Sequence, residues 1–231
     1  MKVASSAKNN AGLTISEQVR SDWPALVLVL ATLVAGFFLY PHLPERVPSH
    51  WNLQGEVDGY SSRFWGAFGL PLLNAAIYLL MLVTPLIDPR KENYRKFAGS
   101  YHTLKIALIL VLTGLYMLVA ASALGYQLSM DKLVPLIISL LFILIGNMMG
   151  KFRHNYFVGI KVPWTLASET VWQKTHRLAA PLWVGAGMLG VAGSLAGGEW
   201  AAALLLIPLS AAVIIPIIYS LMVYNKLNKN K

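Results

Sequence analysis

Five residues between positions 42 and 58 carry the side chains that most often bind metals or transfer protons: His42, Glu45, His50, Glu56 and Asp58. Imidazole and carboxylate groups together could ligate a divalent metal or hold a cationic ligand. Their spacing matches no tight ligand motif such as two histidines three residues apart. We therefore favour a structural role, in which His50 and Asp58 hydrogen-bond the backbone of this segment and hold its turns. We predict no metal and no cofactor.

A second group of polar residues lies between positions 146 and 177. His154 and His176 could titrate near neutral pH, but packing at a membrane interface is the favoured interpretation for both. Gly146 and Gly150 form a small-x-x-x-small pair, which lets two membrane helices approach closely. Asn147 stands between them and could hydrogen-bond to a neighbouring helix.

The sequence lacks the motifs of common enzymes. It has no nucleophile elbow, zinc-protease, Walker or dinucleotide-binding pattern. It also has no cysteine, which excludes disulfides and thiolate metal sites. We predict a protein without catalytic residues. The alternative is an enzyme at the membrane interface that uses His50, Asp58 or His176.

Six long apolar runs must position these residues. Apolar residues make up 56% of the 231 residues and charged residues only 13%, against about 25% charged in ordinary soluble domains. The runs span residues 23–40, 64–87, 106–124, 133–149, 178–196 and 201–224, and none contains a charged residue or histidine. A bilayer core needs about 17–25 such residues per helix, and backbone in lipid must satisfy its own hydrogen bonds. The sequence therefore predicts an all-α membrane protein with six transmembrane helices.

The positive charges predict the orientation of these helices. Of the 19 Lys and Arg residues, 16 lie before residue 23, in 88–105, in 150–177 or after residue 224, whereas Arg46, Arg63 and Lys132 lie in the other connections. The positive-inside rule then places both termini in the cytoplasm, with loop 41–63 outside and loop 150–177 inside. Membrane topology thus accounts for the net charge of +9, and we predict no direct binding of nucleic acid.

The two long loops have different local patterns. Prolines at positions 41, 44 and 48 favour extended backbone, while Gly55 and Asp58–Gly59 are turn signals. From Leu166 to Arg177, apolar residues and tryptophans at helical spacing predict a short amphipathic helix. This helix would lie in the cytoplasmic interface between the fourth and fifth spans.

The chain is therefore expected to have four parts. Residues 1–22 lack an apolar stripe and form a flexible cytoplasmic tail. Residues 23–88 hold the first two spans and the outer Pro-rich loop 41–63. Residues 89–200 hold the third to fifth spans and the cytoplasmic loop 150–177, and residues 201–231 hold the sixth span and a basic tail.

Both loops resemble motifs of known bacterial families. The outer loop is similar to the extracytoplasmic motif of a domain of unknown function, DUF1648, through Pro44, Pro48, His50, Trp51, Asn52, Gly55, Asp58 and Gly59. The inner loop resembles the signature of the SdpI immunity family through Gly146, Asn147, Met149, Gly150, Arg153, Asn155, Gly159, Ile160, Pro163, Trp164, Thr165, Leu166, Trp172, Lys174, Thr175, His176 and Arg177. The sequence departs from that signature at three places. It has Lys161 and Val162 where arginine and threonine are expected, His154 where a proline is expected, and Ala180 where glycine is common.

The resemblance implies a polytopic plasma-membrane protein without catalysis. That family protects bacteria against a secreted, membrane-active toxin peptide, and its immunity protein is also a receptor that holds a cytoplasmic autorepressor at the membrane. The implied partners are thus the lipid bilayer, a toxin peptide at the outer loop and a repressor at the inner loop. The alternative function is a small permease or flippase, with Asn74 and the proline-containing sixth helix lining a path.

Overall fold

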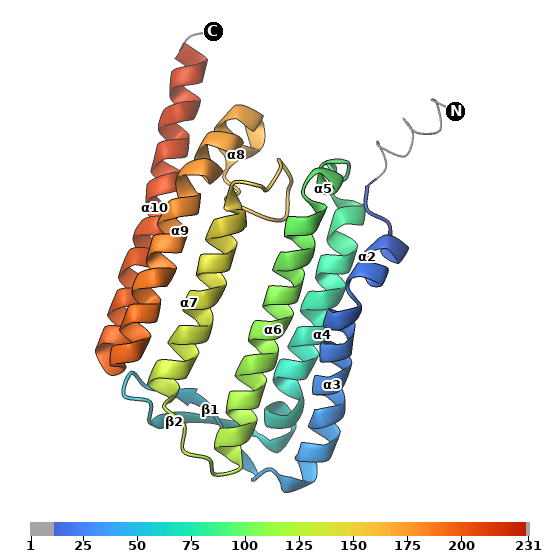
Figure 1. The fold of residues 1–231 in the computed structure, drawn as a ribbon, viewed down its shortest axis with the longest axis vertical. Helices are drawn as coiled ribbons and strands as arrows, with labels where there is room; N and C mark the ends of the chain where they lie inside the picture. Colours follow the sequence, from blue (N-terminus) through green and yellow to red (C-terminus); the bar gives the residue numbers. More distant parts are fainter. Residues whose placement is uncertain (1–11, 230–231) are drawn as a thin grey trace.

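The computed structural model describes residues 12–229 as a bundle of six long helices with a small β-hairpin at one end (Figure 1). The long helices are α3 (Trp23–Leu39), α4 (Arg63–Ile87), α6 (Ala98–Ala123), α7 (Met130–Met149), α9 (Glu169–Ala196) and α10 (Gly198–Lys229). Each is long and apolar enough to cross a bilayer, so the prediction of six spans is confirmed. The shorter elements are α2 (Ile15–Ser21), the 3-10 helix η1 (Tyr40–His42), strands β1 (Arg46–Trp51) and β2 (Val57–Ser62), and helices α5 (Asn93–Lys96) and α8 (Pro163–Ala167).

The six long helices form two groups of three (Figure 1). Helices α3, α4 and α6 contact one another in the first group, and α9 packs against both α7 and α10 in the second. Helices α6 and α7 meet between the groups. Small residues allow α7 to approach α9, because a Cβ at Gly146 would lie 2.7 Å from the Val184 amide nitrogen. The predicted role of Gly146 is thus confirmed, whereas Gly150 has open space beside it.

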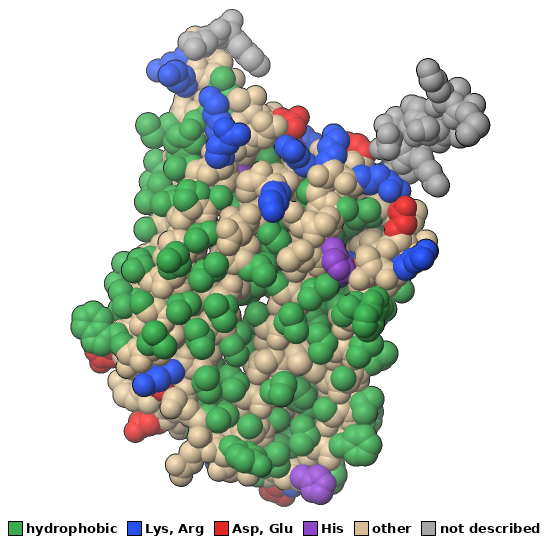
Figure 2. Space-filling view, in the orientation of Figure 1, with side chains coloured by type: hydrophobic (Ala, Val, Ile, Leu, Met, Phe, Trp, Pro, Cys, Tyr) green, Lys and Arg blue, Asp and Glu red, His purple; other side chains and the backbone are tan. Residues whose placement is uncertain are grey.

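The two ends of the bundle differ in structure and charge. We call the end that carries β1, β2 and the α6–α7 and α9–α10 connections the hairpin end (Figure 1). The opposite loop end carries α2, α5, residues 150–162 and α8, and Lys and Arg side chains gather there in the space-filling view (Figure 2). The His50 and Trp164 segments therefore lie at opposite ends, as the charge pattern requires. The compartment that each end faces remains a prediction.

Helix α2 corrects the expectation that residues 1–22 form a flexible tail. The helix has a capping box, in which the Thr14 hydroxyl accepts a hydrogen bond from the Glu17 amide and the Glu17 carboxylate accepts one from the Thr14 amide. The Glu17 carboxylate also pairs with Arg95 at 3.1 Å. These contacts, the Thr14 amide first, lower the pKa of Glu17 to about 2. Residues 1–11 of the expected tail lie outside the described residues.

The prediction of extended backbone is confirmed at Pro48, which lies in β1, but not at Pro41, which lies in the 3-10 helix η1. Of the two predicted turn signals, only Gly55 lies in the turn. The turn lies at Asn52–Gly55, where Gly55 has a φ of +80° and donates to the Asn52 carbonyl. Asp58 and Gly59 belong to β2 instead. Glycine is required at 59 because a Cβ there would lie 2.8 Å from the Cβ of His50, its partner on β1. The hairpin is thus the exception to the predicted all-α architecture.

The helix predicted from Leu166 to Arg177 is also corrected. A short helix, α8, does lie between α7 and α9, but it ends at Ala167. Residues from Glu169 onward are the first turns of α9, which runs directly into the fifth span. Trp172 is completely buried there and does not face a membrane interface.

Candidate functional site

The hairpin is fixed to the bundle by apolar contacts and carries an exposed polar pair. Leu43 and Val47 are buried against Ala67 of α4. His50 Nδ1 lies 2.5 Å from Asp58 Oδ1 across the two strands, with the His50 side chain 73% exposed. The predicted bonds of His50 and Asp58 to the backbone are thus replaced by a bond to each other. Exposed pairs of this kind contribute little to stability, so the pair mainly sets the direction of the imidazole.

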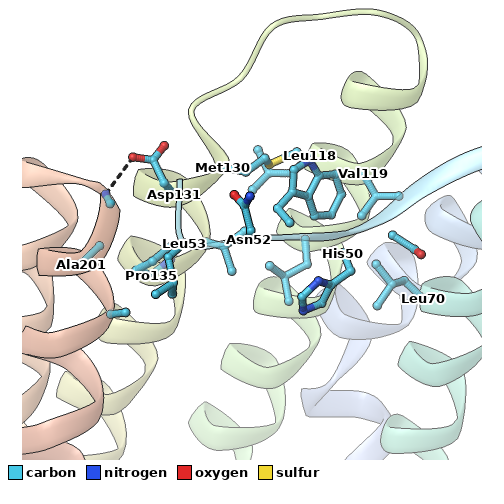
Figure 3. A pocket seen from close by; sticks show the side chains of 16 residues that line it. His50, Asn52, Leu53, Leu70, Leu118, Val119, Met130, Asp131, Pro135 and Ala201 are labelled. Atoms are coloured by element: carbon cyan, nitrogen blue, oxygen red, sulfur yellow. Dashed lines mark hydrogen bonds between the residues drawn. The ribbon is translucent and has the colours of Figure 1, made fainter. Parts of the chain in front are cut away.

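A cavity of about 410 Å³ lies between the hairpin and the bundle (Figure 3). Its roof is the hairpin segment 49–53. Its floor is aliphatic and is contributed by four helices, with Leu70, Leu115, Leu118, Val119, Val134, Pro135, Ala201 and Ala202. Such a volume is typical of sites for small ligands, about 300–1,000 Å³.

The cavity includes only part of the predicted outer site. His50 and Trp51 line it, whereas Pro44, Pro48, Gly55, Asp58 and Gly59 do not. The pattern of the loop missed other lining residues, because Met130 and Asp131 are supplied by α7. Asp131 accepts a hydrogen bond from the Gly198 amide at 3.0 Å and so ties α7 to the start of α10 (Figure 3).

Several of the predicted cytoplasmic residues hold the inner loop together. Asn155 is fully buried, and its side chain makes four hydrogen bonds to the backbone of the same loop, with Arg153, Phe157 and Val158. The Thr165 hydroxyl donates to the Ile160 carbonyl at 2.8 Å. We call the buried side chains of this segment the loop knot: His154, Asn155, Thr165, Trp172, Thr175 and His176.

Two side chains of α9 complete the loop knot. The Trp172 indole donates to the Phe152 carbonyl at 2.9 Å, and its ring stacks on His176 at 4.1 Å. His176 Nε2 accepts a hydrogen bond from the Ile160 amide at 3.0 Å. Gly159, with a φ of +121°, leaves space for these rings, since a Cβ there would collide with His176 Nε2.

The remaining predicted residues are accessible or tie other elements together. Asn147, Gly150, Arg153, Pro163, Lys174 and Arg177 are exposed. The Asn147 amide donates to the Ile143 carbonyl of its own helix, so the predicted bond across helices is not formed there. The Trp164 indole donates to the Ser220 hydroxyl of α10. In the membrane region, Asn74 does bond across helices, to Thr113 at 3.1 Å.

Asp88 connects the loop knot to the first group of helices, and sequence reasoning missed it. Its carboxylate is 2% exposed and accepts hydrogen bonds from the Tyr94 hydroxyl at 3.0 Å, the Tyr156 amide at 2.9 Å and the Arg90 amide at 2.7 Å. The Asn93 amide side chain adds a second tie, to the His154 carbonyl at 2.8 Å. In the sequence, Asp88 is a single acidic residue at the end of an apolar run, and this pattern does not predict its hydrogen-bond partners.

Burial shifts the pKa values of two side chains in this region. It lowers the pKa of His154, with the Arg90 guanidinium acting in the same direction, so the imidazole stays neutral. Burial, and then the Asp88 carboxylate, raises the pKa of Tyr94, which keeps its hydroxyl protonated as a donor. The loop knot is therefore built from neutral donors and acceptors around the Asp88 carboxylate.

A buried ionic cluster was not predicted either. Lys105 of α6 donates to the Asp22 carboxylate at 2.5 Å and to the Gln18 side chain at 3.1 Å, and Lys105 and Asp22 are each 1% exposed. His102 Nδ1 lies 2.5 Å from the other Asp22 oxygen. The sequence placed Lys105 in a loop because the apolar run begins at residue 106, whereas α6 begins at Ala98. Within residues 12–229, His, Asp and Glu side chains form no group of three or more that could hold a metal ion.

Two known families match this chain in the regions just described. The SdpI/YfhL protein family matches residues 151–220, and the domain of unknown function DUF1648 matches residues 27–75. The chain is thus similar to DUF1648 in its first part and to the SdpI/YfhL family in its second part. The match to the SdpI/YfhL family begins at the loop knot and continues through α9 into α10, and the match to DUF1648 covers most of α3, the hairpin and the first half of α4.

One curated relative covers almost the whole chain. Immunity protein SdpI of Bacillus subtilis is 26% identical over 207 residues, which are 90% of this chain and 97% of the relative. No solved structure matches the chain. Together with the six apolar helices, the SdpI-family similarity identifies a multi-pass bacterial membrane protein.

Proposed function

We propose that this chain is a membrane immunity protein that protects its cell against a secreted, membrane-active peptide by binding it at the hairpin end. The observation that carries the proposal is the 410 Å³ cavity beneath the hairpin, at the end of the bundle that the positive-inside rule predicts to face outward. Similarity to an immunity protein over 90% of the chain supports the same role. The proposed role needs no catalysis, cofactor or metal.

A receptor role is the finer part of this proposal. Helix α6 lines the cavity through Leu115 and Leu118 and begins at the loop end, directly after α5. A shift of α6 on ligand binding would therefore reach the ties between Asp88, Asn93 and the loop knot, which is a coupling between two sites. The exposed Arg153, Lys174 and Arg177 would then face a cytoplasmic protein such as a repressor.

The orientation of the bundle is the first test. The chain has no cysteine, so single cysteines at the exposed positions Gln54 and Lys174 report on opposite ends. We expect a membrane-impermeant maleimide to label Gln54→Cys in intact cells and Lys174→Cys only after permeabilisation. Labelling of both variants in intact cells would contradict the proposed topology, and so would the reverse pattern.

Protection of cells is the second test. Production of the chain in a sensitive strain should raise the concentration of membrane-active peptide needed to kill, and His50→Ala should reduce that protection by about tenfold, equivalent to ~1.4 kcal/mol of binding. His50 lines the cavity, whereas His42 is exposed on η1 away from it. His42→Ala is therefore the matched control and should protect like the unchanged chain. Equal protection by both variants would remove the hairpin cavity from the mechanism.

A further inference from the structure

The cavity beneath the hairpin has an apolar side and a polar side. The floor consists of aliphatic side chains, whereas His50 and Asn52 of the hairpin and Asp131 of α7 supply polar groups at its rim (Figure 3), and Ser49 also lines the cavity. Three of these side chains bond within the protein, His50 to Asp58, Asn52 to Glu56 and Asp131 to the Gly198 amide, and they make this side of the cavity polar. The arrangement therefore fits a ligand with one apolar face and polar groups beside it.

The net charge of the hairpin end is opposite in sign to that of the whole chain, and one of its carboxylates, Asp131, lines the cavity. The hairpin end carries five carboxylates, those of Glu45, Glu56, Asp58, Asp131 and Glu199. It carries three cations, Arg46, Arg63 and Lys132, although the chain as a whole has a net charge of +9. Complementary charge favours a cationic ligand and disfavours the phosphate of an anionic lipid.

We propose that the cavity binds the apolar face of a cationic amphipathic peptide segment, whose basic groups face the carboxylates of the hairpin end. This inference rests on the proposed function and names its binding site and ligand class. The peptide enters between the hairpin roof and helices α6, α7 and α10. Its leucine-like side chains contact Leu118, Val134 and Ala202.

The ligand class can be tested with two synthetic peptides. The first is an amphipathic helix of leucine and lysine with one photoreactive leucine, and the second has glutamate in place of every lysine. With the full-length protein in zwitterionic lipid nanodiscs, we expect the lysine peptide to cross-link at least tenfold more efficiently than the glutamate peptide. The cross-links should map to Leu53, Leu118 or Val134. Equal cross-linking of the two peptides would overturn the charge argument, and cross-links confined to the lipid-facing surfaces would overturn the site.

Filling the cavity tests the site directly. Ala202→Trp and, from another helix, Leu118→Trp should each reduce cross-linking of the lysine peptide at least tenfold. Ala211→Trp is the matched control, because Ala211 is exposed on the same helix as Ala202 and does not line the cavity. Unchanged cross-linking in either folded filling variant would overturn the inference. A phospholipid acyl chain that occupies the cavity in the presence of the peptide would also overturn it.

The same variants separate this inference from the proposed function. If the unchanged chain protects cells and Ala202→Trp protects them equally, the cavity site is wrong and the immunity role stands. If the unchanged chain protects against no membrane-active peptide while the lysine peptide still enters the cavity, the immunity role is wrong and the ligand class stands.

Discussion

Replacing Asp22 with asparagine is expected to lower the free energy of unfolding by about 3–5 kcal/mol, the range for breaking a buried ion pair by changing one partner. The substitution keeps the shape of the side chain but removes the anion that faces Lys105 and His102. The Lys105 ammonium would then be buried with the neutral Gln18 oxygen and the Tyr78 and Tyr101 rings as its neighbours. Unfolding by denaturing detergent in mixed micelles measures the change.

Two further variants show whether the ion pair is responsible. The double variant Asp22→Asn, Lys105→Met removes both charges and should recover most of the lost stability, since replacing a buried pair entirely is often close to neutral. Glu17→Gln changes an exposed carboxylate of the neighbouring helix and should have little effect. A double variant less stable than Asp22→Asn alone would show that the pair does not act as a unit.

The same substitution should release helix α2 locally. Gln18 connects α2 to the bundle through bonds to Lys105 and to the Leu82 carbonyl. Once Lys105 is unpaired, α2 is expected to open more often, and cleavage by trypsin at the exposed Arg20 should become faster. The ionic cluster therefore attaches the first described helix to the bundle.

The apolar runs predicted the six spans well, because every helix that crosses lipid needs a long stretch of apolar residues. They predicted the starts of α6 and α9 poorly, since Lys105 and His176 extend the apolar helices into regions that the charge pattern assigned to loops. Their partners lie at least 16 residues away in sequence, Asp22 for Lys105 and Ile160 for His176. A pattern confined to neighbouring residues carries no information about such contacts.

The loop knot shows a second limit of the sequence. The resemblance carried by the motif from Gly146 to Arg177 implies that a cytoplasmic repressor binds at this loop. In the structure, Asn155, Thr165 and Trp172 are fully buried and bond to the loop backbone. The buried residues of this motif therefore stabilise the fold of the loop. The surface proposed to bind a partner consists instead of the exposed basic residues around it.

Asp88→Asn is expected to loosen the loop knot and to cost about 3 kcal/mol of stability, because bonds to a buried carboxylate contribute roughly 1.5–3 kcal/mol each. The variant removes the charge that accepts from the Tyr94 hydroxyl and the Tyr156 amide. Tyr94 cannot compensate by losing its proton, since burial raises its pKa. Hydrogen exchange of the Tyr156 amide should accelerate at least tenfold, with no change in the hairpin.

The effect should be specific to Asp88 and not to any carboxylate near α5. Glu92 precedes α5 and is only partly buried, so Glu92→Gln should leave the exchange of Tyr156 unchanged. If Asp88→Asn also leaves it unchanged, the four bonds of Asn155 hold the loop without help from the first group of helices. A ligand signal that reaches the loop end through α6 would then have no route through Asp88. Acceleration in Asp88→Asn alone would instead identify this carboxylate as the tie through which the two groups of helices act on each other.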